Sequence, residues 1–348
     1  MGHSSSRTSL GKTFLAATLV VAATGCWIVA GLDDRAPTGD PLDGATSDGD
    51  GATTDGPRPD ALGDGGDASV VGCKVEAPFT GSRPLTSLNT PVREGAATLS
   101  PDELEIIFAT EWNFEKDGGL DGGGGQLYRA TRRDRAADFG DVQRLVGARL
   151  GEAQGSPTLT ADGQTLYFIY YEVLGTLNPG VAVARKSTTT PKGLAFDVGM
   201  PMPAIITTPD AEDYVAVSPS GDELFLGRTI GTEHLLYHST RTGGGDFRDP
   251  QELPTPPGKD SYAPVISADG LSLYFAAAIG NGSDGIYRMH RKAPGAFDPA
   301  SVVEVSEVNE GGKQTPLWIS PDLCRLYVSQ SRAGSGILDL RVYEKSPP

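Results

Sequence analysis

Six acidic side chains stand where they could do chemistry. Each comes shortly before an apolar segment, and they are Glu94, Glu152, Glu212, Asp213, Asp260 and Glu310. If these segments converge on one axis, the carboxylates form a ring that could hold a cation or a basic peptide, and their mutual repulsion would raise their pKa values. Such carboxyl groups could also supply the acid and the base of glycoside hydrolysis. The simpler interpretation is that these acids are solvated residues at the ends of loops.

Other chemical signals are weak. His234 and His238 are four residues apart in a predicted strand and could share a face, but no third ligand accompanies them. His290 stands alone, and the sequence has no Gly-x-Ser-x-Gly, His-Glu-x-x-His or phosphate-loop motif. The sequence therefore predicts no catalytic residue, no metal site and no cofactor.

The N-terminus predicts export. Arg7 and Lys12 precede an apolar run that ends in Thr24-Gly25-Cys26, and this ending resembles the lipobox of bacterial lipoproteins, in which Cys26 would carry the lipid. Ala23 stands where such motifs most often have Leu, so an uncleaved anchor over residues 13–32 is the alternative. Trp27 after the cysteine implies the outer membrane, with a periplasm-facing or cell-surface position.

Composition divides the chain. Residues 1–26 are expected to be the signal peptide, residues 27–72 a disordered linker rich in Asp and Gly, and residues 73–348 the folded domain. The formal charge of -16, without a basic stripe, argues against nucleic acid as a partner.

One short motif occurs five times, each time followed by a hydrophobic triplet. Its copies are Ser100-Pro101-Asp102, Thr160-Ala161-Asp162-Gly163, Ser218-Pro219-Ser220-Gly221, Ser267-Ala268-Asp269-Gly270 and Ser320-Pro321-Asp322. Ser or Thr, Pro, Asp and Gly are the residues that a tight turn between strands requires. A period of about 50 to 60 residues fits a four-stranded propeller blade, and triplets without polar alternation predict sheets covered on both faces.

The two ends of the chain should share a blade. Four of the units have a last strand that opens with Phe, at Phe139, Phe196, Phe247 and Phe297, whereas the fifth unit ends before such a strand. The segment 79–89 resembles 297–309, since both run from Phe to Asn. The N-terminal strand is therefore expected to complete the last blade, giving an all-β propeller of five blades rather than six.

The repeat resembles the WD40-like propeller repeat in the C-terminal domain of the TolB family, over residues 79–345. Glu103 and Leu323 depart from the pattern because they replace Gly, which puts the turn geometry there in question. The six blades and the preceding α/β domain of TolB are not expected here. The resemblance implies an envelope protein with a propeller fold.

Cys73 and Cys324 form an even pair in a chain expected to be exported, so a disulfide is predicted, with two free thiols as the alternative. Cys324 begins the second strand of the last blade, and Cys73 lies just ahead of the strand that should complete that blade.

The function expected from the sequence is a non-catalytic platform, tethered to the membrane, that binds an envelope protein or peptide. Glu94, Glu212, Asp213, Asp260 and Glu310 are its candidate binding residues. The alternatives are a glycoside hydrolase-like enzyme and a structural spacer.

Overall fold

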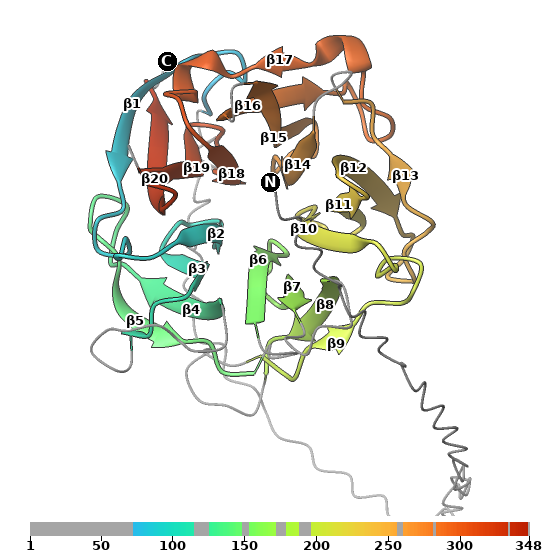
Figure 1. Ribbon diagram of the computed structural model, residues 1–348, viewed down its shortest axis with the longest axis horizontal. Helices are drawn as coiled ribbons and strands as arrows, with labels where there is room; N and C mark the ends of the chain where they lie inside the picture. Colours follow the sequence, from blue (N-terminus) through green and yellow to red (C-terminus); the bar gives the residue numbers. More distant parts are fainter. Residues whose placement is uncertain are drawn as a thin grey trace, which may run out of the picture. The chain divides into compact units, whose positions relative to one another are not determined.

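The computed structural model describes residues 72–114, 125–147, 153–171, 179–187, 196–255, 260–280, 283–332 and 335–346. These residues form five sheets of four strands each, set radially round a common centre (Figure 1). All neighbouring strands of a sheet are antiparallel, for example β2 with β3 and β3 with β4. The predicted five-bladed, all-β propeller is confirmed.

Each of the first four blades uses consecutive strands, with the first strand nearest the centre of the ring in Figure 1. Blade 1 contains β2 (Glu94–Leu99), β3 (Glu105–Thr110), β4 (Gln126–Thr131) and β5 (Gly140–Arg144). Blade 2 contains β6 (Ala153–Leu159), β7 (Thr165–Tyr171), β8 (Gly180–Arg185) and β9 (Met200–Pro201). Blade 3 contains β10 (Ala211–Val217), β11 (Glu223–Ile230), β12 (Glu233–Thr240) and β13 (Gln251–Glu252). Blade 4 contains β14 (Ser261–Ile266), β15 (Ser272–Gly280), β16 (Ser283–His290) and β17 (Val303–Glu304).

The last blade joins the two ends of the folded chain. Blade 5 contains β18 (Gln314–Ile319), β19 (Arg325–Ser331) and β20 (Leu338–Lys345), and its outer strand is β1 (Phe79–Pro84). Strand β1 pairs antiparallel with β20, as expected from the resemblance between segments 79–89 and 297–309. Asn89 and Asn309 also act alike, since the amide oxygen of each accepts the backbone N–H of a third-strand residue, Leu340 at 2.7 Å and Ile286 at 2.8 Å.

The apolar triplets explain how the blades pack. In β3, Ile106 and Phe108 contact a cluster that includes Leu340 and Val342 of blade 5. Ile107 points the other way and packs with Phe168 of blade 2. Because successive side chains of a strand point to opposite faces, a triplet without polar alternation serves two neighbours at once. All of these side chains are fully or almost fully buried.

The repeated turn is held by its own side chains. In four copies the hydroxyl of the Ser or Thr donates to the Asp two residues later, over 2.6 Å in the Ser100 copy, and in the third copy Ser218 bonds the Ser220 hydroxyl instead. In all five copies the hydroxyl also accepts the backbone N–H five residues later. The fourth turn residue is left-handed whether or not it is Gly: φ is 64° at Gly163, 66° at Glu103 and 60° at Leu323. The two departures from Gly therefore do not change the turn geometry.

Glu103 is stabilised in this conformation by distant partners. Its carboxylate has no exposed surface and accepts from Arg325 at 2.8 Å and from the Tyr327 hydroxyl at 2.8 Å, both in blade 5. These bonds link residues more than 220 positions apart in the sequence and join blade 1 to blade 5. Strain of about 1–3 kcal/mol at a left-handed non-glycine residue is tolerated where the surrounding contacts fix it in this way.

The Phe that was expected to open the fourth strand is the first residue of β1 but precedes β5, β13 and β17, and in these four blades a cation lies on its ring. The distance from the cation to the ring centre is 4.4 Å for Arg132 on Phe139 and 4.7 Å for Lys345 on Phe79. Such contacts contribute about 0.5–2 kcal/mol each. The other two pairs are Arg241 on Phe247 and Arg291 on Phe297.

Candidate functional site

A buried polar residue is the first or second residue of the first strand in every blade. Counting six residues back from the Ser or Thr of each repeated turn gives Glu94, Gln154, Glu212, Ser261 and Gln314, whose exposed fractions are 0–4%. Only two of the predicted acids occupy this shared position. The others lie at different positions of the repeat in the sequence, and the five acids within the described residues do not form one ring.

Glu94 is held by the loop that precedes it. The Thr90 hydroxyl donates to its carboxylate at 2.5 Å, the Thr90 backbone N–H at 3.2 Å and the Thr110 hydroxyl at 3.1 Å. Burial raises the pKa of Glu94 to about 7, against the pull of these hydrogen bonds. A side chain with no exposed surface cannot contact a ligand, so Glu94 is a structural residue and not part of a channel mouth.

Glu212 occupies the same position in blade 3 with one added partner. Thr208 donates its hydroxyl to Glu212 at 2.7 Å, as Thr90 does to Glu94, and both follow a Thr-Pro-x-x-Glu pattern. The guanidinium of Arg228 also donates to this carboxylate at 3.0 Å. Burial raises the pKa of Glu212, while Thr208 and Arg228 lower it. Glu212 also has no exposed surface, which excludes it as an acid or base that contacts a glycan in this structure.

The remaining predicted acids are dispersed. Asp213 accepts from the Thr229 hydroxyl at 2.5 Å, and Asp260 accepts the His234 backbone N–H at 3.4 Å. Glu310 is exposed and lies at a separate cavity in blade 5 beside Arg332 and Asp339. Glu152 lies outside the described residues.

A polar cavity lies at the end of the propeller where the first strands begin. It has a volume of about 500 Å³ and is lined by residues of blades 1, 2 and 3. We call it the polar mouth and define it by its functional side chains, Arg93, Glu111, Ser156, Tyr171, Asp213, Tyr214 and His234. Of the predicted acids that the structure describes, Asp213 lines this cavity and the others do not.

Bulges in the first strands create the polar mouth. The register shifts between Glu212 and Tyr214 in β10, so that consecutive side chains Asp213 and Tyr214 both line the cavity. Ser156, at the matching position of β6, is left-handed with a φ of 43°. Its hydroxyl donates to the Asp213 carbonyl oxygen at 3.1 Å and ties blade 2 to blade 3.

Aromatic rings extend from the polar mouth toward blade 4. The Tyr214 and Tyr262 rings lie 5.3 Å apart, and the His234 ring lies 5.6 Å from Tyr262. The Tyr262 hydroxyl donates to Asp284 at 2.5 Å. Burial raises the pKa values of Tyr171, Tyr214 and Tyr262, so these phenols stay protonated at neutral pH and can donate hydrogen bonds.

Sequence reasoning missed Arg93, Tyr171 and Tyr214 as site residues. No repeat marks them, since no other blade has Arg at the position of Arg93 or Tyr at the positions of Tyr171 and Tyr214. The available signal was a tyrosine next to an acid at the start of the first strand, as in Asp213-Tyr214. Gly95 leaves room for the Arg93 guanidinium, because a Cβ at residue 95 would stand 2.9 Å from Nε of Arg93 and would displace the Arg93 side chain.

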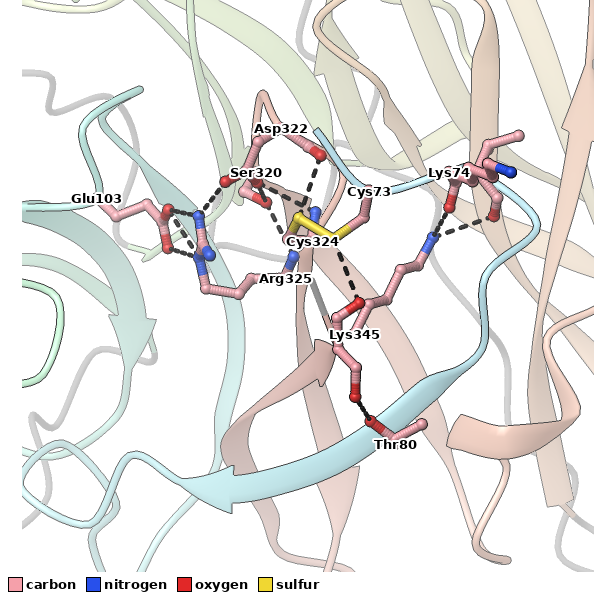
Figure 2. The surroundings of a disulfide bond; sticks show 11 residues. Cys73, Lys74, Thr80, Glu103, Ser320, Asp322, Cys324, Arg325 and Lys345 are labelled. Atoms are coloured by element: carbon pink, nitrogen blue, oxygen red, sulfur yellow. Dashed lines mark hydrogen bonds and ion pairs between the residues drawn. A yellow bond between two sulfur atoms is a disulfide. The ribbon is translucent and has the colours of Figure 1, made fainter. Parts of the chain in front are cut away.

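The structure joins Cys73 and Cys324 in a disulfide beside the seam of blade 5 (Figure 2). The Cys73 backbone N–H donates to the Asp322 carbonyl oxygen at 2.8 Å. The Lys345 ammonium donates to the carbonyl oxygens of Lys74 and Val75 at 3.0 Å each. Together with β1, these contacts attach the start of the folded chain to its last strand.

The histidines have separate surroundings. His238 bonds Glu223 at 2.9 Å and stacks on Phe225, His234 faces Asp260 at 3.6 Å, and His290 meets the Ser272 hydroxyl. Among the residues that the structure describes, no group of three or more His, Cys, Asp or Glu could hold a metal ion.

The predicted signal, Cys26 and the linker lie outside the described residues, as does the alternative anchor over residues 13–32. Within the described ranges, no helix is long and apolar enough to cross a membrane.

Comparisons with known proteins find similarity in structure. No family model matches the sequence, and no curated protein matches it. A putative TolB from Agrobacterium tumefaciens has a TM-score of 0.47 at 14% identity, with 76% of this chain and 83% of that chain covered. TolB from Acinetobacter baumannii has a TM-score of 0.43 at 13% identity over 75% of this chain, which spans 56% of the length of that protein.

Similar solved structures also include enzymes. The periplasmic gluconolactonase of Pseudomonas aeruginosa has a TM-score of 0.40 at 17% identity, with 71% of this chain and 70% of that chain covered. A puromycin hydrolase has a TM-score of 0.40 at 14% identity, with 76% of this chain but 37% of that chain covered. The five four-stranded sheets themselves make this chain a β-propeller, and the solved structures similar to it include TolB proteins.

Proposed function

We propose that this chain is an exported, envelope-tethered propeller that binds a protein or peptide partner at its polar mouth and has no catalytic role. The carrying observation is the cavity of about 500 Å³ in which a guanidinium, a carboxylate, an imidazole and phenol rings from three blades converge. Concave sites that combine aromatic rings with a few placed polar groups are typical of ligand binding.

The residues at one position of the first strand, four before the Ser or Thr of the turn, support this placement. They differ in size and polarity between neighbouring blades, being Ala96, Ser156, Tyr214, Ala263 and Pro316. The repeat therefore supplies the scaffold, and the unrepeated residues supply the specificity.

The burial and hydrogen bonding of the acids fit a binding role better than a glycoside hydrolase. Glu94 and Glu212 have no exposed surface, and Asp213 already accepts a hydrogen bond from Thr229. A glycosidase needs two carboxyl groups that flank the substrate bond. The hydrolase alternative therefore loses Glu94 and Glu212 as groups that could contact a glycan, whereas Asp260 and Glu310 keep exposed surface.

Export is supported by the disulfide. Disulfides persist in the periplasm and outside the cell and are rare in the cytosol. The Cys73–Cys324 bond thus agrees with the signal predicted from Arg7, Lys12 and Cys26. We infer that Cys26 is lipidated and that the propeller faces the periplasm or the cell surface.

Site-specific photocrosslinking in whole cells tests the proposal. A benzoyl-phenylalanine at Glu111, an exposed residue of the polar mouth, should give discrete protein adducts. The same probe at Gln251, which is exposed on the outer strand β13, is the matched control and should give none. Adding Tyr214→Ala should abolish the adducts from position 111. Equal adducts at both positions, or none at position 111, would contradict a partner at this mouth.

A further inference from the structure

A second cavity lies at the opposite end of the central channel. It has a volume of about 320 Å³ and is lined by residues of all five blades. Its rim is the second residue of each repeated turn, and its wall includes the last residue of each first strand. We call this cavity the apolar mouth, and these residues are Pro101, Ala161, Pro219, Ala268 and Pro321 at the rim and Leu99, Leu159, Val217, Ile266 and Ile319 in the wall.

The interior of the apolar mouth has no charged side chain among its described lining residues. The polar side chains that line it are Thr98, Thr158 and Thr160. The Thr158 hydroxyl already accepts the Val217 backbone N–H at 3.3 Å, and the Thr160 hydroxyl donates to Asp162 at 2.6 Å. An apolar group is therefore the occupant that this interior suits.

The apolar mouth is a blind funnel. Toward the middle of the channel the open space falls to about 20 Å³, between residues that include Ala97, Pro264 and Pro316. A space of this size holds at most a single water molecule. The funnel can thus receive one or two side chains from outside, but a polypeptide cannot pass through to the polar mouth.

Carboxylates surround the rim. Asp102, Asp162 and Asp269 follow the rim residues directly and are exposed. Hydrogen bonds from Ser100 and Thr160 lower the pKa values of Asp102 and Asp162, so these two are ionised at neutral pH. The repeated cations Arg132, Arg241 and Arg291 lie at the ends of the third strands, farther from the axis, where each covers a Phe ring.

This combination selects one kind of occupant. A negatively charged rim repels fatty acids and anionic lipid headgroups, and it attracts a basic segment. We propose that the apolar mouth is a second binding site, independent of the polar mouth, for a positively charged peptide segment that inserts one large apolar side chain into the funnel. The inserted side chain is the anchor, and the flanking cations face the rim carboxylates.

Calorimetric titration of the full chain with three synthetic peptides tests this assignment. The probe is acetyl-Lys-Lys-Gly-Trp-Gly-Lys-Lys-amide; one control has Ala in place of Trp, and the other has Glu in place of every Lys. We expect the probe to bind and each control to bind at least about tenfold more weakly, because one loses the buried anchor and the other the charge complementarity.

Protein variants locate the site. Ala268→Lys places a charge at the rim and should weaken probe binding at least about tenfold. Ala268→Pro is the matched control, because three of the other turns already have Pro there, and it should bind like the wild type. The exposed pair Asp162→Asn and Asp269→Asn should weaken binding. Because both carboxylates accept hydrogen bonds within their turns, thermal unfolding of this variant checks that the turns still form. Tyr214→Ala, in the polar mouth, should leave probe binding unchanged.

Each result that contradicts the proposal shows either that the apolar mouth binds something else or that it binds nothing. Absence of probe binding at millimolar concentration, equal binding of the Ala or Glu peptide, or an unaffected Ala268→Lys protein would overturn the proposal. Binding to phosphatidylglycerol vesicles that Ala268→Lys abolishes would assign a lipid instead. Self-association in sedimentation experiments that the same substitution abolishes would assign a second copy of the chain. The polar-mouth crosslinking result does not depend on any of these outcomes.

Discussion

The ammonium of Lys345 lies 4.7 Å from the centre of the Phe79 ring, so β20 and β1 make the contact that three of the other blades make within one continuous unit. Burial lowers the pKa of Lys345 to about 8, and its three protons are directed to the carbonyl oxygens of Lys74 and Val75 and to this ring. The blade assembled from both ends therefore repeats the interactions of the others and adds a disulfide to them (Figure 2).

Loss of the disulfide should destabilise the propeller. Replacing Cys73 and Cys324 together with Ala should lower the free energy of unfolding by about 2–5 kcal/mol, because the unfolded chain regains the freedom of a long loop. Urea denaturation measures the change. Wild-type protein in a reductant is the control and should unfold at the same urea concentration as the variant. A variant as stable as the oxidised wild type would contradict this role.

Glu94 should make stability depend on pH. Its pKa is about 7 in the folded chain and 4.5 without the fold, so the folded state favours the protonated carboxyl. That stabilisation is complete below pH 4.5 and is lost as the pH rises through about 7. Glu94→Gln cannot ionise, and its stability relative to the wild type should increase between pH 4.5 and 7 and then level off. Urea denaturation across this range measures the difference. A difference that does not vary with pH would refute the assignment.

Glu212→Gln should lower the stability of the protein at neutral pH, whereas Glu94→Gln should raise it. Arg228 is 7% exposed and would keep its charge without the carboxylate that now accepts from it at 3.0 Å. The expected loss is about 1–3 kcal/mol, the cost of leaving a buried charged donor poorly paired. Thermal unfolding of Glu94→Gln and Glu212→Gln at pH 8 gives the comparison, since the two residues share one position of the repeat. If Glu212→Gln instead stabilised the protein, the charge pair with Arg228 would not contribute to stability.

Glu103→Gln should lower the free energy of unfolding more than the same substitution at a partly exposed Glu. It leaves Arg325 and Arg132 near an uncharged amide in the interface of blades 1 and 5, and the expected loss is about 3–5 kcal/mol. Glu105→Gln is the control, because the Glu105–Arg129 pair is partly exposed and should contribute about 1 kcal/mol or less. Urea denaturation distinguishes the two, and equal losses would contradict the role of Glu103 in closing the ring.

The sequence by itself determined the repeat and the architecture that follows from it. The Ser100 hydroxyl, the Asp102 carboxylate and the triplet 106–108 interact within a few residues of each other, so their pattern shows directly in the chain. The Phe at or before the start of each fourth strand is also a local signal, and the displaced copy at Phe79 was enough to predict the shared blade. A disulfide beside that seam followed from the same placement.

Only the tertiary structure decided which polar residues are available to a ligand. Glu94 and Asp213 look alike in the sequence, yet one is sealed by the Thr90 loop and the other lines a cavity. The difference arises because a bulge in each first strand changes the direction of the next side chains, and because neighbouring blades supply the burial. Glu103 shows the same limit, since its partner Arg325 stands more than 220 residues away in the chain. Side-chain direction at a bulge and contacts across a ring closure are properties of the assembled fold, and no local pattern encodes them.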